Sequence, residues 1–240
     1  MSFTGMTRVG EIAAANPRAK RVLEEAGLDY CCGGEKSLHD ACMRANVSPE
    51  EILKRLQENS KQAGPDEANW ASASLSDLTQ HIREKHHRYV REVIPRVRAL
   101  LGRVKAKHGQ NHPELAGIEE LFFDLGQDMY SHMQKEEQIL FPYIEALQSS
   151  TGGNGKLEPP FFQTVRNPVQ MMMQEHDSAG EALLAMRKLS SAYQTPADGC
   201  ESYRELYRSL AEFEGDMHTH VHLENNILFP RAVELEAAKT

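Results

Sequence analysis

The chain has 240 residues, a formal net charge of −8 and only four cysteines. This length can bury the core of one large domain, or of one large and one small domain, without disulfides. An acidic chain is a poor nucleic-acid binder, and no apolar run approaches the roughly 18 residues that span a bilayer. The first residues also lack the basic end and apolar core of a secretory signal. We therefore expect a cytoplasmic protein with no nucleic-acid or membrane partner.

The first part of the chain, residues 1–58, reads as a small helical domain. Short helices are predicted over 37–46 and 49–57, the second with a capping signal in Ser48-Pro49-Glu50-Glu51. A unit of this size is marginal alone, so we expect it to dock on the rest of the chain or on a second copy in a homodimer. Residues 59–74 lack an apolar period and are predicted to be a linker.

Residues 75–240 carry apolar residues at the spacing of long amphipathic helices, and no strand is indicated. Glycine- and proline-containing breaks separate these helices, and a long loop is expected over 149–166. Four long helices joined this way predict an all-α fold built on an antiparallel four-helix bundle. The helices are expected over 75–107, 113–148, 167–192 and 200–237.

A repeated motif lies in two of these helices. His132 to Pro142 and His220 to Pro230 both read H-x3-E-x2-I-L-F-P. Another histidine precedes each motif at a similar distance, which indicates an internal duplication of a helix pair. Residues i and i+4 share one face of a helix, so each motif directs an imidazole and a carboxylate to the same point.

The polar residues of this motif fall in the apolar stripes, where leucine is expected. Burying them is costly unless a partner satisfies them, and that partner is either their own mutual hydrogen bonding or a metal. Imidazole and carboxylate suit iron, manganese or zinc, and two carboxylates that can bridge favour two ions. The candidate ligands from these stripes are His132, Glu136, His176, His220 and Glu224.

The first long helix leaves its own ligand ambiguous, because the apolar spacing points to His86 rather than to the adjacent His87. His81 is either an outer partner of the site or exposed. His218 and His222 lie off the stripe, so they are expected at the surface or as outer partners of the site. The remaining histidines are expected to be solvated: His39, His108 and His112.

The cysteines divide into a pair and two single residues. Cys31 and Cys32 are adjacent in a glycine-rich turn, and they are either thiols that take part in transfer or packing residues. A lowered thiol pKa near a helix N-terminus would make them reactive. Cys42 is expected in the core, and Cys200, at a helix start, is expected to have no role.

Taken together, these motifs make the sequence resemble the Repair of Iron Centres proteins, a cytoplasmic family that repairs iron-sulfur clusters. The marks are Asp29-Tyr30-Cys31-Cys32-Gly33-Gly34 in an N-terminal helical domain and the two H-x3-E motifs in a hemerythrin-like bundle, over nearly the whole chain. The resemblance implies two iron ions with an oxo-type bridge and both glutamates bridging. The family takes the second of two adjacent histidines in its first helix. The implied ligands are His87, His132, Glu136, His176, His220 and Glu224.

The resemblance also implies a function. Such proteins restore iron-sulfur clusters damaged by nitric oxide or oxidative stress, by donating iron to damaged client proteins, with Cys31 and Cys32 as transfer thiols. We expect an iron donor rather than a turnover enzyme. Two alternatives remain: a di-iron nitric oxide reductase, and a hemerythrin-like sensor or carrier of oxygen or nitric oxide.

Overall fold

The computed structural model describes residues 3–15, 17–59, 70–150 and 160–239. Within these ranges the chain is helical and forms no strand, apart from an isolated bridge between Arg8 and Ser37. The all-α fold class predicted from the sequence is confirmed. Most of the predicted linker, 60–69, and half of the predicted long loop, 151–159, lie outside the described residues. No helix in the described ranges is long and apolar enough to cross a bilayer.

The described residues group into two compact units. One comprises residues 80–143 and 158–218, and the other residues 1–79, 144–157 and 219–240. The boundaries between them fall inside three continuous helices, α5 (Leu75–His81), α8 (Phe141–Ser149) and α10 (Glu201–Leu223).

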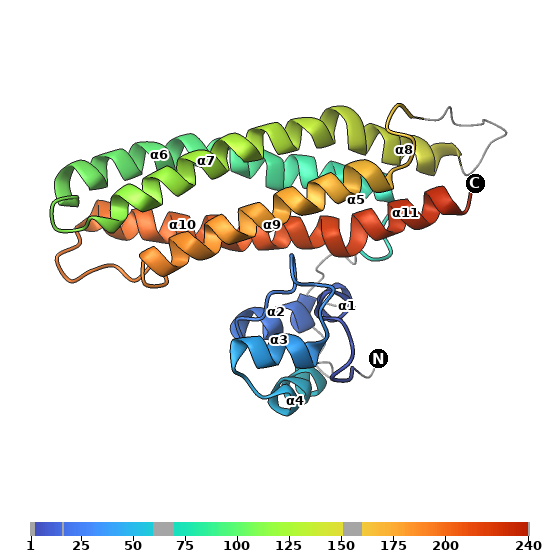
Figure 1. The fold of residues 1–240 in the computed structure, drawn as a ribbon, viewed down its shortest axis with the longest axis horizontal. Coiled ribbons are helices and arrows are strands. Elements are labelled where there is room, and N and C mark those ends of the chain that lie inside the picture. The colour runs from blue at the N-terminus through green and yellow to red at the C-terminus, as the bar shows by residue number, and fades with distance from the viewer. Residues whose placement is uncertain (1–2, 16, 60–69, 151–159, 240) are drawn as a thin grey trace. The chain divides into compact units, whose positions relative to one another are not determined.

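The unit of residues 80–143 and 158–218 is a bundle of long helices. Consecutive helices run in opposite directions, as predicted from the short breaks between them (Figure 1). Their observed ends lie within a few residues of the predicted ones. The elements are η1 (Ile82–His87), α6 (Arg88–His108), α7 (Glu114–Lys135), η2 (Glu136–Leu140), α9 (Arg166–Leu189) and α10 up to residue 218.

Aliphatic and aromatic side chains at helical spacing hold this bundle together. On α6, Val90, Ile94 and Val97 are completely buried. Phe122 of α7 and Phe213 of α10 meet edge to face, with ring centroids 5.3 Å apart. Each such side chain contributes about 1.5–3 kcal/mol when fully buried. This dry core fixes the helices whose polar residues form the candidate site.

Three of the long histidine-bearing helices depart from α-helical geometry, whereas α9, which carries His176, does not. A π-helical turn interrupts the first at Ile82–His87, the second at Glu136–Leu140 and the last at η4, Glu224–Leu228. A π-turn accommodates one extra residue and rotates the side chains that follow it. A spacing of 3.6 residues per turn holds only along an uninterrupted α-helix, so it does not place the residues that follow a π-turn.

The second unit contains the short N-terminal helices. The predicted cap at Ser48 is confirmed, since its hydroxyl accepts from the backbone N–H of Glu51 at 3.3 Å. Ser37 caps the preceding helix by accepting from Asp40 N at 3.1 Å. The elements are α1 (Val9–Ala15), α2 (Pro17–Glu25), α3 (Leu38–Ala45), α4 (Pro49–Asn59), α5, α8, η4 and α11 (Phe229–Ala237).

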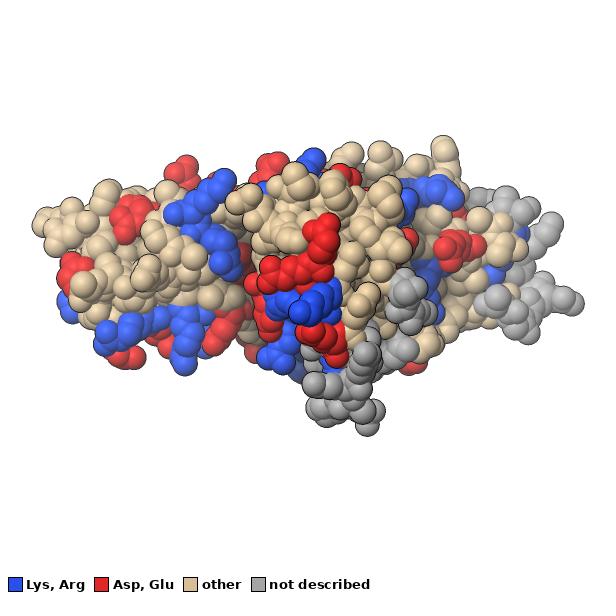
Figure 2. All heavy atoms as spheres, turned by 90° about the horizontal axis from the view of Figure 1, so that it is seen from below, with Lys and Arg blue, Asp and Glu red and all other residues tan. Residues whose placement is uncertain are grey.

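Within this unit the N-terminal helices pack against the C-terminal segment of the chain. Helix α1 contacts η4, and Lys20 of α2 donates to the hydroxyl of Thr219 at 3.2 Å. These contacts lie within the unit, and docking on the bundle or on a second copy stays a prediction. The face in Figure 2 intersperses lysine and arginine with aspartate and glutamate, and no extended basic patch forms there.

Alanine substitutions at two glycines of the bundle can test how closely α6 and α7 pack. Gly102 in α6 has open space where a Cβ would lie, whereas a Cβ on Gly126 in α7 would approach Ile94 Cγ2 to 3.2 Å. Alanine removes backbone entropy from the unfolded chain in both cases, so Gly102→Ala is expected to stabilise by about 0.5–1 kcal/mol. Gly126→Ala should lose part or all of that gain to crowding. Urea unfolding measures both, and equal gains would contradict the close α6–α7 packing.

Candidate metal centre

One carboxylate in the bundle faces two imidazoles. Glu136 is completely buried, and its Oε2 lies 3.3 Å from His87 Nε2 and 3.3 Å from His132 Nε2. His132 and Glu136 lie one turn apart, as the H-x3-E spacing predicted. His176 of α9 lies close by, with its Nε2 3.1 Å from His132 Nε2. Three histidines thus present Nε2 atoms within one buried region.

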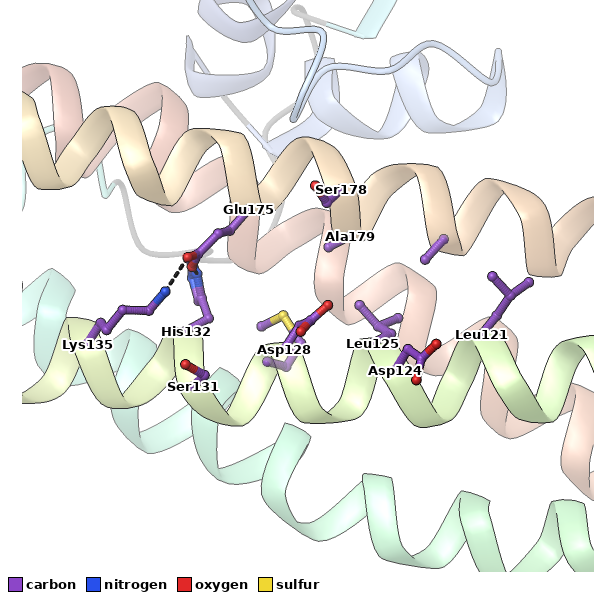
Figure 3. A pocket seen from close by; sticks show the side chains of 12 residues that line it. Leu121, Asp124, Leu125, Asp128, Ser131, His132, Lys135, Glu175, Ser178 and Ala179 are labelled. Atoms are coloured by element: carbon purple, nitrogen blue, oxygen red, sulfur yellow. Dashed lines mark hydrogen bonds and ion pairs between the residues drawn. The ribbon is translucent and has the colours of Figure 1, made fainter.

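The outer nitrogens of two of these histidines bond to carboxylates. His87 Nδ1 donates to Glu137 at 2.7 Å, and His132 Nδ1 donates to Glu175 at 2.8 Å (Figure 3). A histidine that donates through Nδ1 leaves Nε2 as the acceptor, the form in which it binds a metal. Carboxylate-supported histidines of this kind are characteristic of metal centres, where the outer partner fixes the ring and raises its basicity.

The two outer carboxylates are also tied to cations. Arg91 bonds Glu137 at 2.8 Å, and Lys135 bonds Glu175. The hydrogen bond from His132, with help from Lys135, lowers the pKa of Glu175 to about 2. Partial burial opposes the shift at Glu137, but its bonds to Arg91 and His87 hold its pKa below the ordinary value. Both carboxylates are therefore ionised at neutral pH and act as acceptors.

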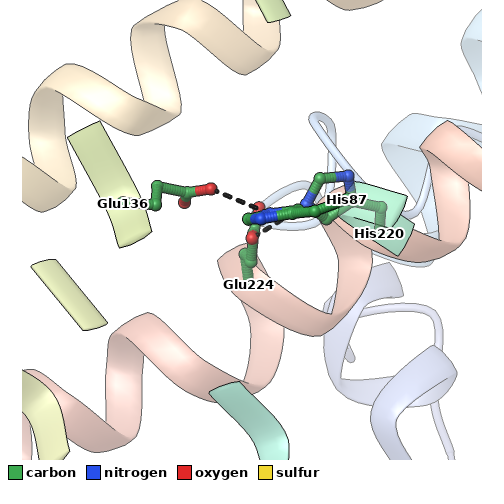
Figure 4. A group of neighbouring side chains, drawn as sticks. All are labelled: His87, Glu136, His220 and Glu224. Carbon is green, nitrogen blue, oxygen red and sulfur yellow. Dashed lines mark hydrogen bonds and ion pairs between the residues drawn. The ribbon is translucent and has the colours of Figure 1, made fainter. Parts of the chain in front are cut away.

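The second motif repeats the pair at the end of the last long helix. His220 Nε2 lies 3.0 Å from Glu224 Oε1, and both side chains are completely buried (Figure 4). Glu224 opens the π-turn η4 just as Glu136 opens η2. The duplication seen in the sequence thus extends to local geometry.

The described side chains include two groups of four whose ligand atoms all lie within 4.8 Å of one another. Both groups contain Glu136 and Glu224. Nitrogen and carboxylate donors in a dry interior are costly without a cation, and this donor set suits iron, manganese or zinc. The residues present therefore fit a metal. The groups are His87, Glu136, His220 and Glu224, and His132, Glu136, His176 and Glu224.

The structure distinguishes the two adjacent histidines of the first long helix. Both are buried, but among the residues that the structure describes only His87 belongs to one of the two groups that could hold a metal ion. The other imidazole, His86, has Nδ1 2.9 Å from Asp216 Oδ1. The apolar spacing favoured His86 because it assumed 3.6 residues per turn, whereas both residues lie in the π-turn η1.

A pocket of about 280 Å³ opens beside His132. Asp128 and Ser131 of α7 line it, together with Glu175 of α9 (Figure 3). Its wall includes the ring of His132, so small molecules in the pocket can approach this histidine. Nothing in the sequence pattern indicated the pocket, because its lining combines polar residues from outside the apolar stripes.

The cysteine turn is held by the segment that follows Glu224. Asn226 Nδ2 donates to the carbonyl of Tyr30 at 2.9 Å, and Asn225 Nδ2 donates to that of Cys31 at 3.4 Å. Gly34 is needed here, since a Cβ on it would overlap the Asn226 side chain. The turn is therefore anchored two residues beyond a candidate metal ligand.

The thiol of Cys31 does not have the lowered pKa that would make it reactive. Cys31 is buried, and its thiol donates to Asp29 Oδ1 at 3.3 Å. The hydrogen bond with Cys32, burial and the neighbouring charges together raise the pKa of Cys31 well above the ordinary thiol value. Cys31 is consequently a protonated thiol in this arrangement, and no helix N-terminus lowers its pKa.

His108, expected to be solvated, and His222, expected at the surface or as an outer partner of the site, are both buried. His222 is 3% exposed and His108 is 9% exposed. Burial lowers the pKa of His222 to about 3, and its Nδ1 lies 3.0 Å from Asn226 Nδ2, which fits a neutral ring. Spacing missed His222 because it packs edge to face on Tyr30, from a distant part of the sequence. Cys42 is buried, as expected.

Comparison with protein families divides the chain into two matches. Residues 78–232 match the Hemerythrin HHE cation binding domain. Residues 5–60 match ScdA_N, described as a Domain of Unknown function (DUF542). The larger match covers both repeated motifs and the smaller one covers the cysteine pair.

Individual relatives are similar over nearly the whole chain. The iron-sulfur cluster repair protein YtfE of Musicola paradisiaca is 35% identical over 95% of this chain and 97% of its own length. A probable iron-sulfur cluster repair protein of Haemophilus influenzae is 34% identical over 97% of this chain and 99% of its own. The YtfE protein of Escherichia coli O8 is 32% identical, with 94% and 96% covered.

The anchor of the cysteine turn can be tested directly. Asn226→Ala leaves the Tyr30 carbonyl without its donor, which is expected to cost about 1–3 kcal/mol. Alkylation of Cys31, followed by mass spectrometry, should become faster as the turn loosens. Asn167→Ala is a matched control, because Asn167 makes the same 2.9 Å amide-to-carbonyl bond at an exposed site, to Phe162. Equal Cys31 alkylation rates in both variants would contradict the anchor.

Proposed function

Because the chain belongs to the family of iron-sulfur cluster repair proteins, we propose that it binds two iron ions and donates iron to damaged iron-sulfur clusters. The observation that carries the proposal is the pair of four-residue groups that share Glu136 and Glu224. Carboxylates common to two groups suit bridging between two ions. The proposed ligands are His87, His132, Glu136, His176, His220 and Glu224.

Iron bound by these residues supplies exchangeable cargo and open positions for small ligands. The chain's own residues set how firmly the cargo is held. Glu137 and Glu175 orient two imidazoles with Nε2 toward Glu136. The aliphatic core excludes water from the carboxylates, which strengthens their attraction for a cation. The π-turns after Glu136 and Glu224 supply backbone adjustment at the two residues that must release a bridge.

The cysteine pair is proposed to act after iron leaves the carboxylates. Thiolate is the soft ligand that iron in a cluster prefers, so an exposed thiol pair suits a handover to a client protein. In the arrangement described, Cys31 is buried and protonated while Cys32 is partly exposed. Handover on this account requires the turn to leave Asn225 and Asn226, which would expose Cys31 and remove the burial that raises its pKa.

The proposal extends to the organisation and surroundings of the chain. Residues 1–58 form the thiol-bearing domain, 59–74 a linker, and 75–240 the di-iron bundle. The partners are iron-sulfur proteins damaged by nitric oxide or oxidative stress. We place the protein in the reducing cytoplasm, where its four cysteines stay free. A homodimer through the N-terminal domain stays a prediction.

Iron content tests the bridging glutamates. Glu136→Leu and Glu224→Leu are each expected to lower bound iron from two per chain to less than one. Glu120→Leu, at an exposed position on the same helix α7, is the control. Full iron in both buried variants, measured by metal analysis beside thermal unfolding, would overturn the ligand assignment.

Repair itself tests the thiols. The double variant Cys31→Ala, Cys32→Ala is expected to keep its iron but to restore activity of a nitric-oxide-damaged iron-sulfur enzyme at least tenfold more slowly. Cys42→Ala is the control, since Cys42 is buried away from the turn in α3. Loss of iron in the double variant would make the cysteines ligands. Steady consumption of nitric oxide with an electron donor, without iron transfer, would favour the reductase alternative instead.

A further inference from the structure

A second set of nucleophilic and titratable side chains lies at the α6–α7 turn and the start of α10, and the repair proposal does not use it. Cys200 Sγ lies 3.2 Å from Nε2 of His108, the last residue of α6. The imidazole is nine-tenths buried, while the thiol is partly exposed. A buried base beside an accessible thiol is the arrangement that activates cysteine nucleophiles.

The start of α10, like the His108 imidazole, favours the ionised form of the Cys200 thiol. The carbonyl of Cys200 accepts from the backbone N–H of Tyr203 at 3.0 Å and of Arg204 at 3.1 Å, so Cys200 occupies the N-cap position. Its sulfur therefore lies at the positive end of the helix dipole, which favours a thiolate. The bond to His108, followed by the backbone N–H of Tyr203, lowers the pKa of Cys200 to about 7.

A pocket with basic side chains lies at the α6–α7 turn, where it is lined by Lys107 and Gly109, the chain neighbours of His108. Its volume is about 440 Å³, and its lining includes Lys105, Lys107 and His112. His112 Nε2 bonds Asp198, two residues before Cys200, so the pocket wall is tied to the loop that carries the thiol. Although burial opposes it, the bonds of His112 to Glu114 and Asp198 raise its pKa. Lys105 is paired with Glu119, and His112 with Glu114 and Asp198. The lining residues that the structure describes include Lys107 and no carboxylate, so the pocket suits an anionic molecule of modest size.

We propose that Cys200 is a thiol-modification site that exchanges with acidic low-molecular-weight disulfides, with His108 as its base and the neighbouring pocket as the binding site for the acidic groups. The proton of Cys200 passes to His108 Nε2. The thiolate then attacks one sulfur of the disulfide, so that a new S–S bond forms as the old one breaks. The departing thiolate takes a proton from His108, and Cys200 is left in a mixed disulfide.

The expected rate of disulfide exchange at Cys200 follows from the fraction of its thiol that is ionised. At pH 7 a thiol with a pKa of about 7 is about half ionised, against about one part in a hundred at the ordinary value of 9.0. The lower nucleophilicity of the more acidic thiolate offsets part of this gain. A net acceleration of about fivefold remains. This acceleration belongs to the folded chain, because it depends on His108 and on the helix.

The test follows mixed-disulfide formation at each cysteine by peptide mass spectrometry, with the iron-loaded full chain and oxidised glutathione at pH 7. Cys200 should react about fivefold faster in the folded chain than in urea. His108→Gln should remove most of that acceleration, while His39→Gln, at an exposed histidine far along the chain, should leave it. A Cys200 rate no higher in the folded chain than in urea would overturn the proposal, whether or not His108→Gln folds.

A second experiment tests the role of the pocket. Lys107→Glu should slow the reaction of Cys200 with oxidised glutathione and leave its reaction with uncharged hydroxyethyl disulfide unchanged. Equal slowing with both disulfides, or slowing with neither, would contradict recognition of the acidic groups. Iron content measured on the same samples separates this outcome from any failure of the proposed iron site.

Discussion

The structure depends on imidazoles and carboxylates placed where a helical core would normally hold leucine. Glu136 and Glu224 are completely buried, as are His87 and His220. Such groups destabilise a dry interior unless a cation or a complete set of hydrogen bonds compensates them. The chain supplies part of that compensation through Glu137 and Glu175. A bound cation would supply the rest, and metal binding would then be coupled to the stability of the fold.

Three of the helices that carry these groups also depart from regular α-helix. π-turns are rare and occur mainly at functional sites. Here they occupy the first turn after each repeated glutamate and the turn that carries His87. Because a π-turn rotates the side chains that follow it, the candidate ligands need not follow the same helical spacing as the apolar stripe. The aliphatic residues can then stay in the core while a histidine one position along the chain reaches the site.

The sequence predicted the bundle well because the apolar period is long and regular. Helix ends at residues 107–108 and 113–114 were found within one residue, since Gly109 and Pro113 mark them. The H-x3-E pairs were likewise predictable, because four residues make one turn. His87 could not be chosen over His86 from spacing alone, because spacing assumes the helix stays α. The family resemblance implied His87, which stays a proposed ligand.

Other parts of the site depend on contacts between distant segments, which a single sequence does not encode as a pattern. Glu175 meets His132 across two helices, and Asn226 meets Tyr30 from nearly two hundred residues away. The pairing of Cys200 with His108 is of the same kind, and it places a cysteine that was expected to have no role beside a buried imidazole. The buried, protonated state of Cys31 also follows from such packing.

We propose that Glu136 and Glu224, the glutamates common to both groups, help to hold two iron ions. The most direct measurement is anaerobic titration of the metal-free full chain with ferrous iron, followed by metal analysis and an absorption spectrum after exposure to air. We expect saturation at two irons per chain, with near-ultraviolet charge-transfer bands and a higher unfolding temperature than that of the metal-free chain. Saturation at one iron, or no binding with an unchanged unfolding temperature, would contradict the proposal.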